Sequence, residues 1–336
     1  MRWVDVDAYV AAHRGEWDRL GQLVARRGRL DGEEVDELVG LYQRVATHLS
    51  MVRSSSPDPD LIGRLSSLVA RARSAVTGAH NPAWKDGARF FTVVFPAAVF
   101  RARRWSAAVA AFFVIIAVLA GAWVAGDPEV QAAVGTQEEI RRLVEVDFEE
   151  YYSTDPAASF AGRVWTNNAW VAAVCIASGI GLGLFPIFVL AQNAFGIGVA
   201  GGLMSEAGRL DLFFGLILPH GLLELTSVFV AGGVGIRLGW TVVDPGLRTR
   251  PQALAEEGRA AIAVALGLMG VLLFSGLIEA FVTPSGLPTG ARIAIGAIAL
   301  AVFVGYVVVL GGRSARAGEI GDLGSEELAD RLPTAA

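Results

Sequence analysis

A histidine and a glutamate lie inside a stretch of sequence that is otherwise apolar enough to cross a lipid bilayer. The stretch covers residues 212–238 and contains Pro219-His220-Gly221 followed by Glu224. A helix rises about 1.5 Å per residue, so this stretch can span a hydrocarbon core of roughly 30 Å. An acidic side chain at that depth costs about 2.5–3.5 kcal/mol on insertion scales and must face protein or water. The sequence therefore predicts an integral membrane protein with a buried polar group.

The composition limits the classes of partner and site. Apolar residues make up 53% of the chain, and the formal net charge is −5. Such a chain offers no basic stripe for phosphate groups, so no nucleic-acid partner is expected. Cys175 is the single cysteine, which excludes an internal disulfide framework and a site built from several thiolates.

The first part of the chain predicts a cytoplasmic helical bundle. Residues 1–81 hold three amphipathic stretches separated by turn signals, and their short connections favour antiparallel neighbours. Asp31 followed by Glu34 is a pair typical of a helix N-terminus.

Residues 82–104 predict an elbow helix that lies on the membrane surface and leads into the first span, 105–125. Three arginines at the end of this elbow mark the cytoplasmic side. The following segment, 126–164, is rich in acidic residues and carries a potential capping box at Thr136 and Glu139. We expect an amphipathic helix here that rests on the outer face or docks on the spans.

The transmembrane domain, residues 105–312, is predicted to cross the membrane six times with both ends in the cytoplasm, because arginines gather in 239–259 and in the tail 313–336. The expected spans are 105–125, 165–191, 194–208, 212–238, 260–282 and 291–311. The third of these is either a short span or a re-entrant half-helix. We favour two spans that meet in a tight inner turn at Gln192-Asn193.

This all-α arrangement predicts a layer of polar residues from several spans, most of it in the outer half of the membrane. The candidate polar residues are Asn167, Asn168, Asn193, His220, Glu224 and Glu279. The residues expected to shape the helices are Gly181, Gly183, Pro186, Pro219, Gly221 and Pro284. Two interpretations of the polar layer stay open: contacts that fasten helices at modest energy, about 1–2 kcal/mol each, and a site for transport or catalysis.

Catalytic and metal sites are the weaker alternatives. One histidine with two carboxylates is a thin ligand set for a metal, and no serine, cysteine or second histidine is clearly placed beside His220. His13, His48 and His80 are scattered in the soluble part, and we interpret them as surface or core-edge residues. We expect no catalytic residue, cofactor or metal; an intramembrane metal-dependent enzyme is the remaining enzymatic alternative.

The sequence resembles the stage II sporulation protein M family in its longer, actinobacterial-type form. The resemblance is carried by Asn167-Asn168 before a Gly-rich span, the segment Asn193 to Gly202, Pro219-His220-Gly221 with Glu224, Gly235 to Gly239, Leu277-Ile278-Glu279-Ala280-Phe281 with Pro284, and Trp17, Leu20, Tyr42 and Leu49 near the start. The Pro-His-Gly-x-x-Glu element is the most specific of these. The chain departs from the short sporulation form by its soluble head and its last span, 291–311.

The resemblance implies a membrane scaffold or anchor in a bacterial cytoplasmic (inner) membrane. In spore formers, this family anchors an engulfment complex whose partners remodel peptidoglycan; relatives elsewhere are commonly encoded near MoxR-type ATPases. The expected partners are membrane lipid and envelope proteins such as peptidoglycan hydrolases or a MoxR-type ATPase, and self-association is left open. The alternative function is a transporter or channel for a small solute, ion or lipid, because a Gly-rich broken hairpin faces buried ionisable groups.

Overall fold

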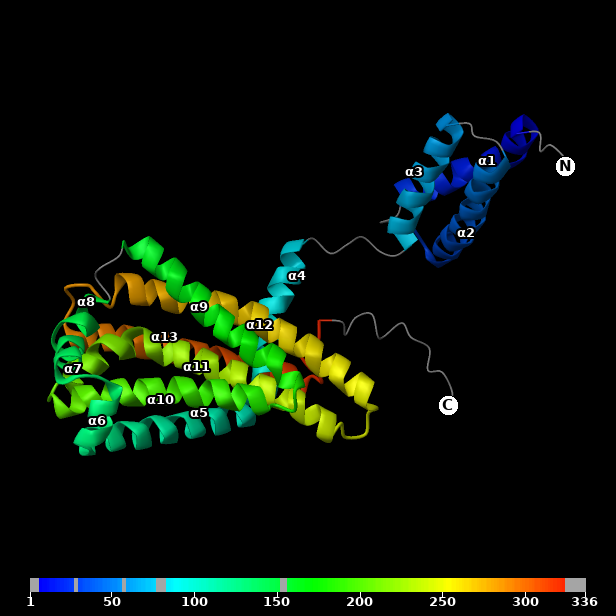
Figure 1. The fold of residues 1–336 in the computed structure, drawn as a ribbon. Helices are drawn as coiled ribbons and strands as arrows, with labels where there is room; N and C mark the ends of the chain where they lie inside the picture. Colours follow the sequence, from blue (N-terminus) through cyan, green and yellow to red (C-terminus); the bar gives the residue numbers. More distant parts are fainter. Residues whose placement is uncertain (1–5, 27–29, 56–58, 77–82, 152–155, 324–336) are drawn as a thin grey trace. The chain divides into compact units, whose positions relative to one another are not determined.

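The computed structural model of the protein describes residues 6–26, 30–55, 59–76, 83–151 and 156–323 (Figure 1). All the regular elements in these ranges are helices, which confirms the all-α prediction for the described part of the chain. The chain divides into two compact units, Met1–Asp86 and Gly87–Ala336. The boundary predicted at residue 81, His80 and residues 324–336 of the predicted tail lie outside the described residues.

The first unit, called the head below, is a bundle of α1 (Val6–Ala25), α2 (Gly32–Ser55) and α3 (Pro59–Val76). Its core is apolar and separate from that of the second unit; it contains Trp17, Leu20, Leu23, Leu38, Leu41, Val45, Leu49, Val52, Leu65, Leu68 and Ala72. The predicted N-terminal pair of α2 is confirmed, because the Glu34 amide donates to Asp31 Oδ1 (2.9 Å) and the Asp31 amide donates to Glu34 Oε2 (3.4 Å).

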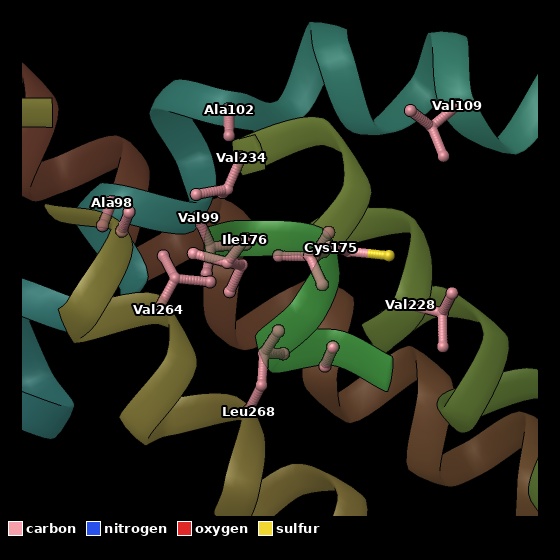
Figure 2. Packing of buried hydrophobic residues seen from close by; sticks show 14 of the residues in the cluster. Ala98, Val99, Ala102, Val109, Cys175, Ile176, Val228, Val234, Val264 and Leu268 are labelled. Carbon is pink, nitrogen blue, oxygen red and sulfur yellow. The ribbon is translucent and has the colours of Figure 1, made fainter. Parts of the chain in front are cut away.

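In the described part of the second unit, successive long helices run in opposite directions and form a bundle (Figure 1). They are α5 (Phe95–Gly126), α9 (Ala157–Ala177), α10 (Leu184–Glu206), α11 (Leu210–Val243), α12 (Arg250–Phe281) and α13 (Thr289–Tyr306). Figure 2 shows that α5, α9, α11 and α12 share one apolar core, to which Ala98, Cys175, Val234 and Val264 belong.

Among the described residues, five helical stretches are long and apolar enough to cross a membrane: Trp84–Gly126, Leu184–Glu206, Leu210–Val243, Arg250–Phe281 and Thr289–Arg316. These lengths and compositions agree with a membrane protein. Helix α9 is not among them, although it runs beside α11 and α12 in the bundle. The number of crossings and their orientation therefore stay predictions.

The predicted turn at Gln192-Asn193 is wrong. The chain reverses earlier, through the short helix η3 (Ser178–Ile180) and the residues up to Gly183, whose φ of +74° favours glycine. Asn193 lies inside α10, where its side-chain amide donates to the Val189 carbonyl one turn earlier (2.8 Å). The expected spans 165–191 and 194–208 are accordingly replaced by α9 and by α10, which is a continuous helix of 23 residues.

The early turn is held by close backbone packing against α11. A side chain on Gly235 would collide with the carbonyl group of Cys175 at the end of α9. Small residues at such positions let helix backbones approach closely, which is a common way of packing helices in membranes. The glycines therefore allow close packing between α9 and α11. The sequence pattern alone does not indicate which pair of helices they bring together.

The elbow predicted over 82–104 does not form a separate helix. Helix α4 (Ala83–Arg89), η1 (Phe90–Val94) and α5 follow one another without a break, and Phe95 to Val99 are buried in the bundle. Pro96 has no amide hydrogen, so the helix widens over η1 to accommodate it. The Phe91 carbonyl, left without an amide from Pro96, accepts the Tyr306 hydroxyl instead.

The acidic segment after α5 forms α6 (Pro128–Val134), α7 (Gln137–Arg142), η2 (Leu143–Asp147) and α8 (Phe148–Glu150) at one end of the bundle (Figure 1). The predicted capping box of Thr136 and Glu139 is confirmed. Val144 is buried in a cluster with residues of α10 and α11, and its carbonyl accepts the Arg209 guanidinium (2.7 Å). The segment is therefore docked on the long helices, one of the two arrangements expected.

The described part of the predicted tail is packed on the bundle. After η4 (Val307–Gly311) and α14 (Gly312–Arg316), the chain continues to Asp322, which is 1% exposed. Both Asp322 oxygens accept the Arg259 guanidinium, at 2.5 and 2.6 Å. Residues 313–323 are therefore a structural part of the second unit.

Candidate functional site

Two neighbouring helices of the bundle carry polar side chains at four-residue spacing, which places each set on one helix face. Helix α11 presents His220 and Glu224, α12 presents Ser275 and Glu279, and Thr283 follows in the turn after α12. The two helices are antiparallel neighbours, so the sets face each other. His220, Glu224 and Glu279 are called the His–Glu cluster below.

The imidazole of His220 links the two helices. Its Nδ1 hydrogen-bonds the Thr283 hydroxyl (3.2 Å), and its Nε2 lies 3.7 Å from Glu279 Oε1. The Ser275 hydroxyl donates to the backbone carbonyl of His220 (3.0 Å). When the Thr283 hydroxyl donates to Nδ1, the proton of a neutral imidazole sits on Nε2 and faces Glu279.

Helix α9 joins the cluster through an amide side chain. The Asn168 side chain lies within hydrogen-bonding reach of the Glu224 carboxylate. His220 and Glu279 are 6% and 4% exposed, and Glu224 is half-buried. Three helices that are distant in sequence are thus connected by polar groups inside the bundle, where water does not compete for the hydrogen bonds.

One atom of the cluster has no hydrogen-bond partner among the described residues. Glu279 Oε2 is buried and accepts no hydrogen bond from the described residues. A buried polar atom without a partner loses its hydration and gains nothing in return. Because the Glu279 carboxylate lies near a second carboxylate, Glu224, a proton or a cation bound there would offset the negative charge of the site.

The cluster has the geometry of a possible cation site. One ligand atom from each of His220, Glu224 and Glu279 lies within 4.8 Å of the other two. Imidazole nitrogen and carboxylate oxygen are common zinc ligands, and Asn168 or Thr283 could supply a further oxygen. The residues would also suit a shared proton. Nucleophilic catalysis is less well supported, because the Ser275 hydroxyl is bonded to the main chain of His220 and not to its ring.

The predicted polar residues separate into two groups. The structure brings Asn168, His220, Glu224 and Glu279 together. Asn167 is exposed, and its only described hydrogen bond is a long one to Asn168 (3.5 Å). Asn193 is exposed on α10 and bonds its own helix, so it does not belong to the cluster.

The predicted helix-shaping residues are distributed over three places. Gly181 and Gly183 form the turn between α9 and α10, and Pro186 lies in the first turn of α10. Pro219 is inside α11 next to Gly221, where its main-chain carbonyl closely approaches Gly296 of α13. Pro284 lies in the turn that follows α12. Only Pro219 and Gly221 adjoin the His–Glu cluster in sequence.

Three residues near the cluster were missed by sequence reasoning. Ser275 and Thr283 could have been found, because they lie four residues before and after Glu279 in the sequence. Tyr151, at the end of α8 in the acidic segment, gives no such signal. Burial raises the pKa of its hydroxyl, and the neighbouring Glu279 carboxylate raises the pKa further, which places Tyr151 within electrostatic range of the cluster.

A second polar group lies at the opposite end of the same helices. Glu257 Oε1 accepts the guanidinium groups of Arg101 (2.8 Å) and Arg237 (2.9 Å), and Arg248 lies 3.6 Å away. These four residues are called the arginine cluster below. They connect α5, α11, α12 and the loop before α12.

Comparison with known proteins finds matches for both units. The family described as stage II sporulation protein M matches residues 109–284, and a domain of unknown function matches residues 7–78. An uncharacterised protein of Methanocaldococcus jannaschii is 30% identical over 124 residues, which cover 36% of this chain and 69% of that protein. No solved structure matches. The match over 109–284 contains the whole His–Glu cluster.

Proposed function

Because the chain belongs to the stage II sporulation protein M family, we propose that it is an integral membrane scaffold that organises partners in remodelling the cell envelope. One observation carries this proposal: the polar side chains inside the bundle are used to connect helices. His220 binds Thr283, Ser275 binds the main chain of His220, and Asn168 reaches Glu224. Such contacts fix the register of helices, as a rigid anchor requires.

The distribution of charge supports an orientation for this scaffold. The arginine cluster, Arg259, Arg313 and Arg316 all lie at the end of the bundle where α11 ends and α12 begins. By the positive-inside rule this end faces the cytoplasm. The acidic segment α6–α8 then lies on the outer side, and the membrane is the inner membrane of a bacterium.

Two surfaces are available for partners in this scheme. The outer one is the acidic segment α6–α8. The other is a groove of about 920 Å³ on the head, between α1 and α3, which is bordered by the exposed Arg14, Arg64 and Arg71. A partner with an acidic docking segment would fit this groove. Peptidoglycan hydrolases on the outer side and a MoxR-type ATPase on the cytoplasmic side are the partners that we propose.

The scaffold proposal is tested by purifying the tagged full-length chain from membranes in mild detergent and identifying what accompanies it. We expect envelope proteins in stoichiometric amounts. The double variant Arg64→Glu, Arg71→Glu should lose the cytoplasmic partner, whereas Arg53→Glu, which does not line the groove, should keep it. A chain that purifies alone under all conditions would contradict the proposal.

A second function, movement of a small cation or solute, is supported by the unpaired oxygen of Glu279. Transport sites in membranes are often built from buried ionisable groups of this kind. Vesicles that contain the purified chain test this alternative. Ion or proton flux that disappears in Glu279→Gln, at unchanged protein abundance, would favour transport. The scaffold predicts no flux, together with lower abundance of His220→Ala and Glu224→Ala.

A further inference from the structure

The head brings together two histidines that are far apart in the sequence. His13 lies on α1 and His48 on α2, and their ring centroids are 4.1 Å apart. Glu16, one turn after His13, places its Oε2 atom 3.7 Å from His13 Nδ1 and 3.8 Å from His48 Nδ1. The interpretation of these histidines as scattered is therefore wrong for His13 and His48. One ligand atom from each of the three residues lies within 4.8 Å of the other two.

Only one of the two Glu16 carboxylate oxygens has a charged partner among the described residues at short range apart from the histidines. Its Oε1 atom pairs with Arg44 Nε (3.6 Å), which holds the carboxylate in place. Its Oε2 atom is buried and accepts no hydrogen bond from the described residues. The unpaired oxygen thus points to a position that is bordered by two imidazole nitrogens.

Exposure gives this position access to solvent. The side chains of His13 and Glu16 are 31% and 37% exposed, whereas that of His48 is 10% exposed. A ligand could enter from the side of His13 and Glu16, and water could complete its coordination. On the buried side, the Trp17 indole N–H donates to His48 Nδ1 (3.2 Å), and the Tyr9 ring lies 4.5 Å from that of His13.

We propose that the head binds one divalent transition-metal ion, zinc in the first place, between His13, Glu16 and His48. Two imidazole nitrogens and one carboxylate oxygen are a ligand set found in zinc sites that keep a fourth position for water. The ion would satisfy Glu16 Oε2 and connect α1 to α2. It would take the His48 Nδ1 lone pair, so the Trp17 indole must release that nitrogen. This metal site does not depend on the scaffold proposal.

The test uses the full-length chain, purified in detergent, stripped with a chelator and dialysed against zinc. We expect one zinc per chain at micromolar free metal, measured by elemental analysis. His13→Ala and Glu16→Gln should each weaken binding by at least about tenfold, because changes even to groups that only orient metal ligands have effects of this size. Both residues are partly exposed, so the variants should fold, which far-UV circular dichroism checks.

Three further variants make the test specific. Glu37→Gln removes a head carboxylate that Arg19 holds and should leave binding unchanged. His220→Gln should also leave it unchanged, which distinguishes the head from the His–Glu cluster. Trp17→Phe frees His48 Nδ1 and should bind zinc at least as tightly as the natural chain.

Cobalt gives a second measurement, because nitrogen and oxygen ligands around a bound Co²⁺ produce visible absorption bands. These bands should appear in the natural chain and be absent from His13→Ala. The proposal is overturned by any of three results: no zinc bound at 100-fold excess, equal binding by His13→Ala and Glu16→Gln, or loss of zinc in His220→Gln alone.

Discussion

The two ends of the helical bundle each contain a buried carboxylate, but they surround it with very different numbers of hydrogen-bond donors. At one end, a single oxygen of Glu257 has two arginines within 2.9 Å and a third at 3.6 Å. At the other end, Glu279 has one imidazole nitrogen at 3.7 Å, and its second oxygen has no donor among the described residues. Both side chains are almost fully buried.

The difference teaches what each end can do. A buried carboxylate that is paired with several arginines connects the helices that carry them. Its removal leaves those positive charges unpaired. A carboxylate with too few donors keeps the capacity to take up a proton or a cation. The arginine cluster is therefore a structural element, and the His–Glu cluster is the better candidate for a function that changes with its surroundings.

The largest expected effect is at the arginine cluster. Glu257→Gln keeps the shape of the side chain but removes the charge that offsets Arg101 and Arg237. Breaking a buried ion pair by removing one partner costs about 3–5 kcal/mol. We expect a much lower yield of monodisperse protein and a lower melting midpoint in detergent. Glu256→Gln, which affects only the pairing with Arg248, is the matched control and should be mild.

The next effect concerns the C-terminal segment. Asp322→Ala removes both hydrogen bonds to Arg259, and hydrogen bonds that involve charged groups contribute about 1.5–3 kcal/mol. We expect residues 313–323 to become sensitive to protease while the long helices stay protected. Glu319→Ala, whose partner Arg89 is 3.4 Å away, should change the cleavage pattern less. Unchanged cleavage in Asp322→Ala would show that this segment is held by other contacts.

A smaller effect is expected at the His–Glu cluster. Glu279→Gln removes one of two neighbouring carboxylates and breaks no described hydrogen bond. Its effect on stability should stay near or below about 1 kcal/mol, the centre of the range measured for single substitutions. The melting midpoints of Glu279→Gln and Glu257→Gln, measured in the same detergent, compare the two positions directly. Equal losses at the two positions would end the distinction between the two ends.

The smallest effect lies outside both clusters and depends on pH. The Thr136 amide and hydroxyl hold the pKa of Glu139 below its usual range. Because the folded pKa is lowered, this stabilisation is present above the unfolded pKa of about 4.3 and is lost as the pH falls through the folded value. Thr136→Val should speed hydrogen exchange in 137–142 at pH 7, and its difference from the natural chain should shrink at acidic pH. A difference that persists unchanged at pH 3 would contradict this account.

Part of the fold could be predicted from sequence because it is local. The amphipathic stretches of the head, the capping boxes at Asp31 and Thr136, and the apolar stretches within α11 and α12 each depend on neighbours a few residues away. The placement of His220 and Glu224 on one helix face also follows from helical periodicity. The presence of a polar group inside the bundle is therefore a property that the sequence pattern predicts correctly.

The sequence alone determined the helical class, the apolar stretches and most of the polar and ionisable residues that form the candidate site. Only the tertiary structure decided which glycines make the turn before α10, that Phe95 to Val99 are buried, and that His13 meets His48. It also decided which carboxylate receives arginines and which has an oxygen without a described donor. The physical reason is that periodicity fixes the face of a helix on which a side chain lies, whereas the partner of that face depends on backbone contacts between segments far apart in the chain.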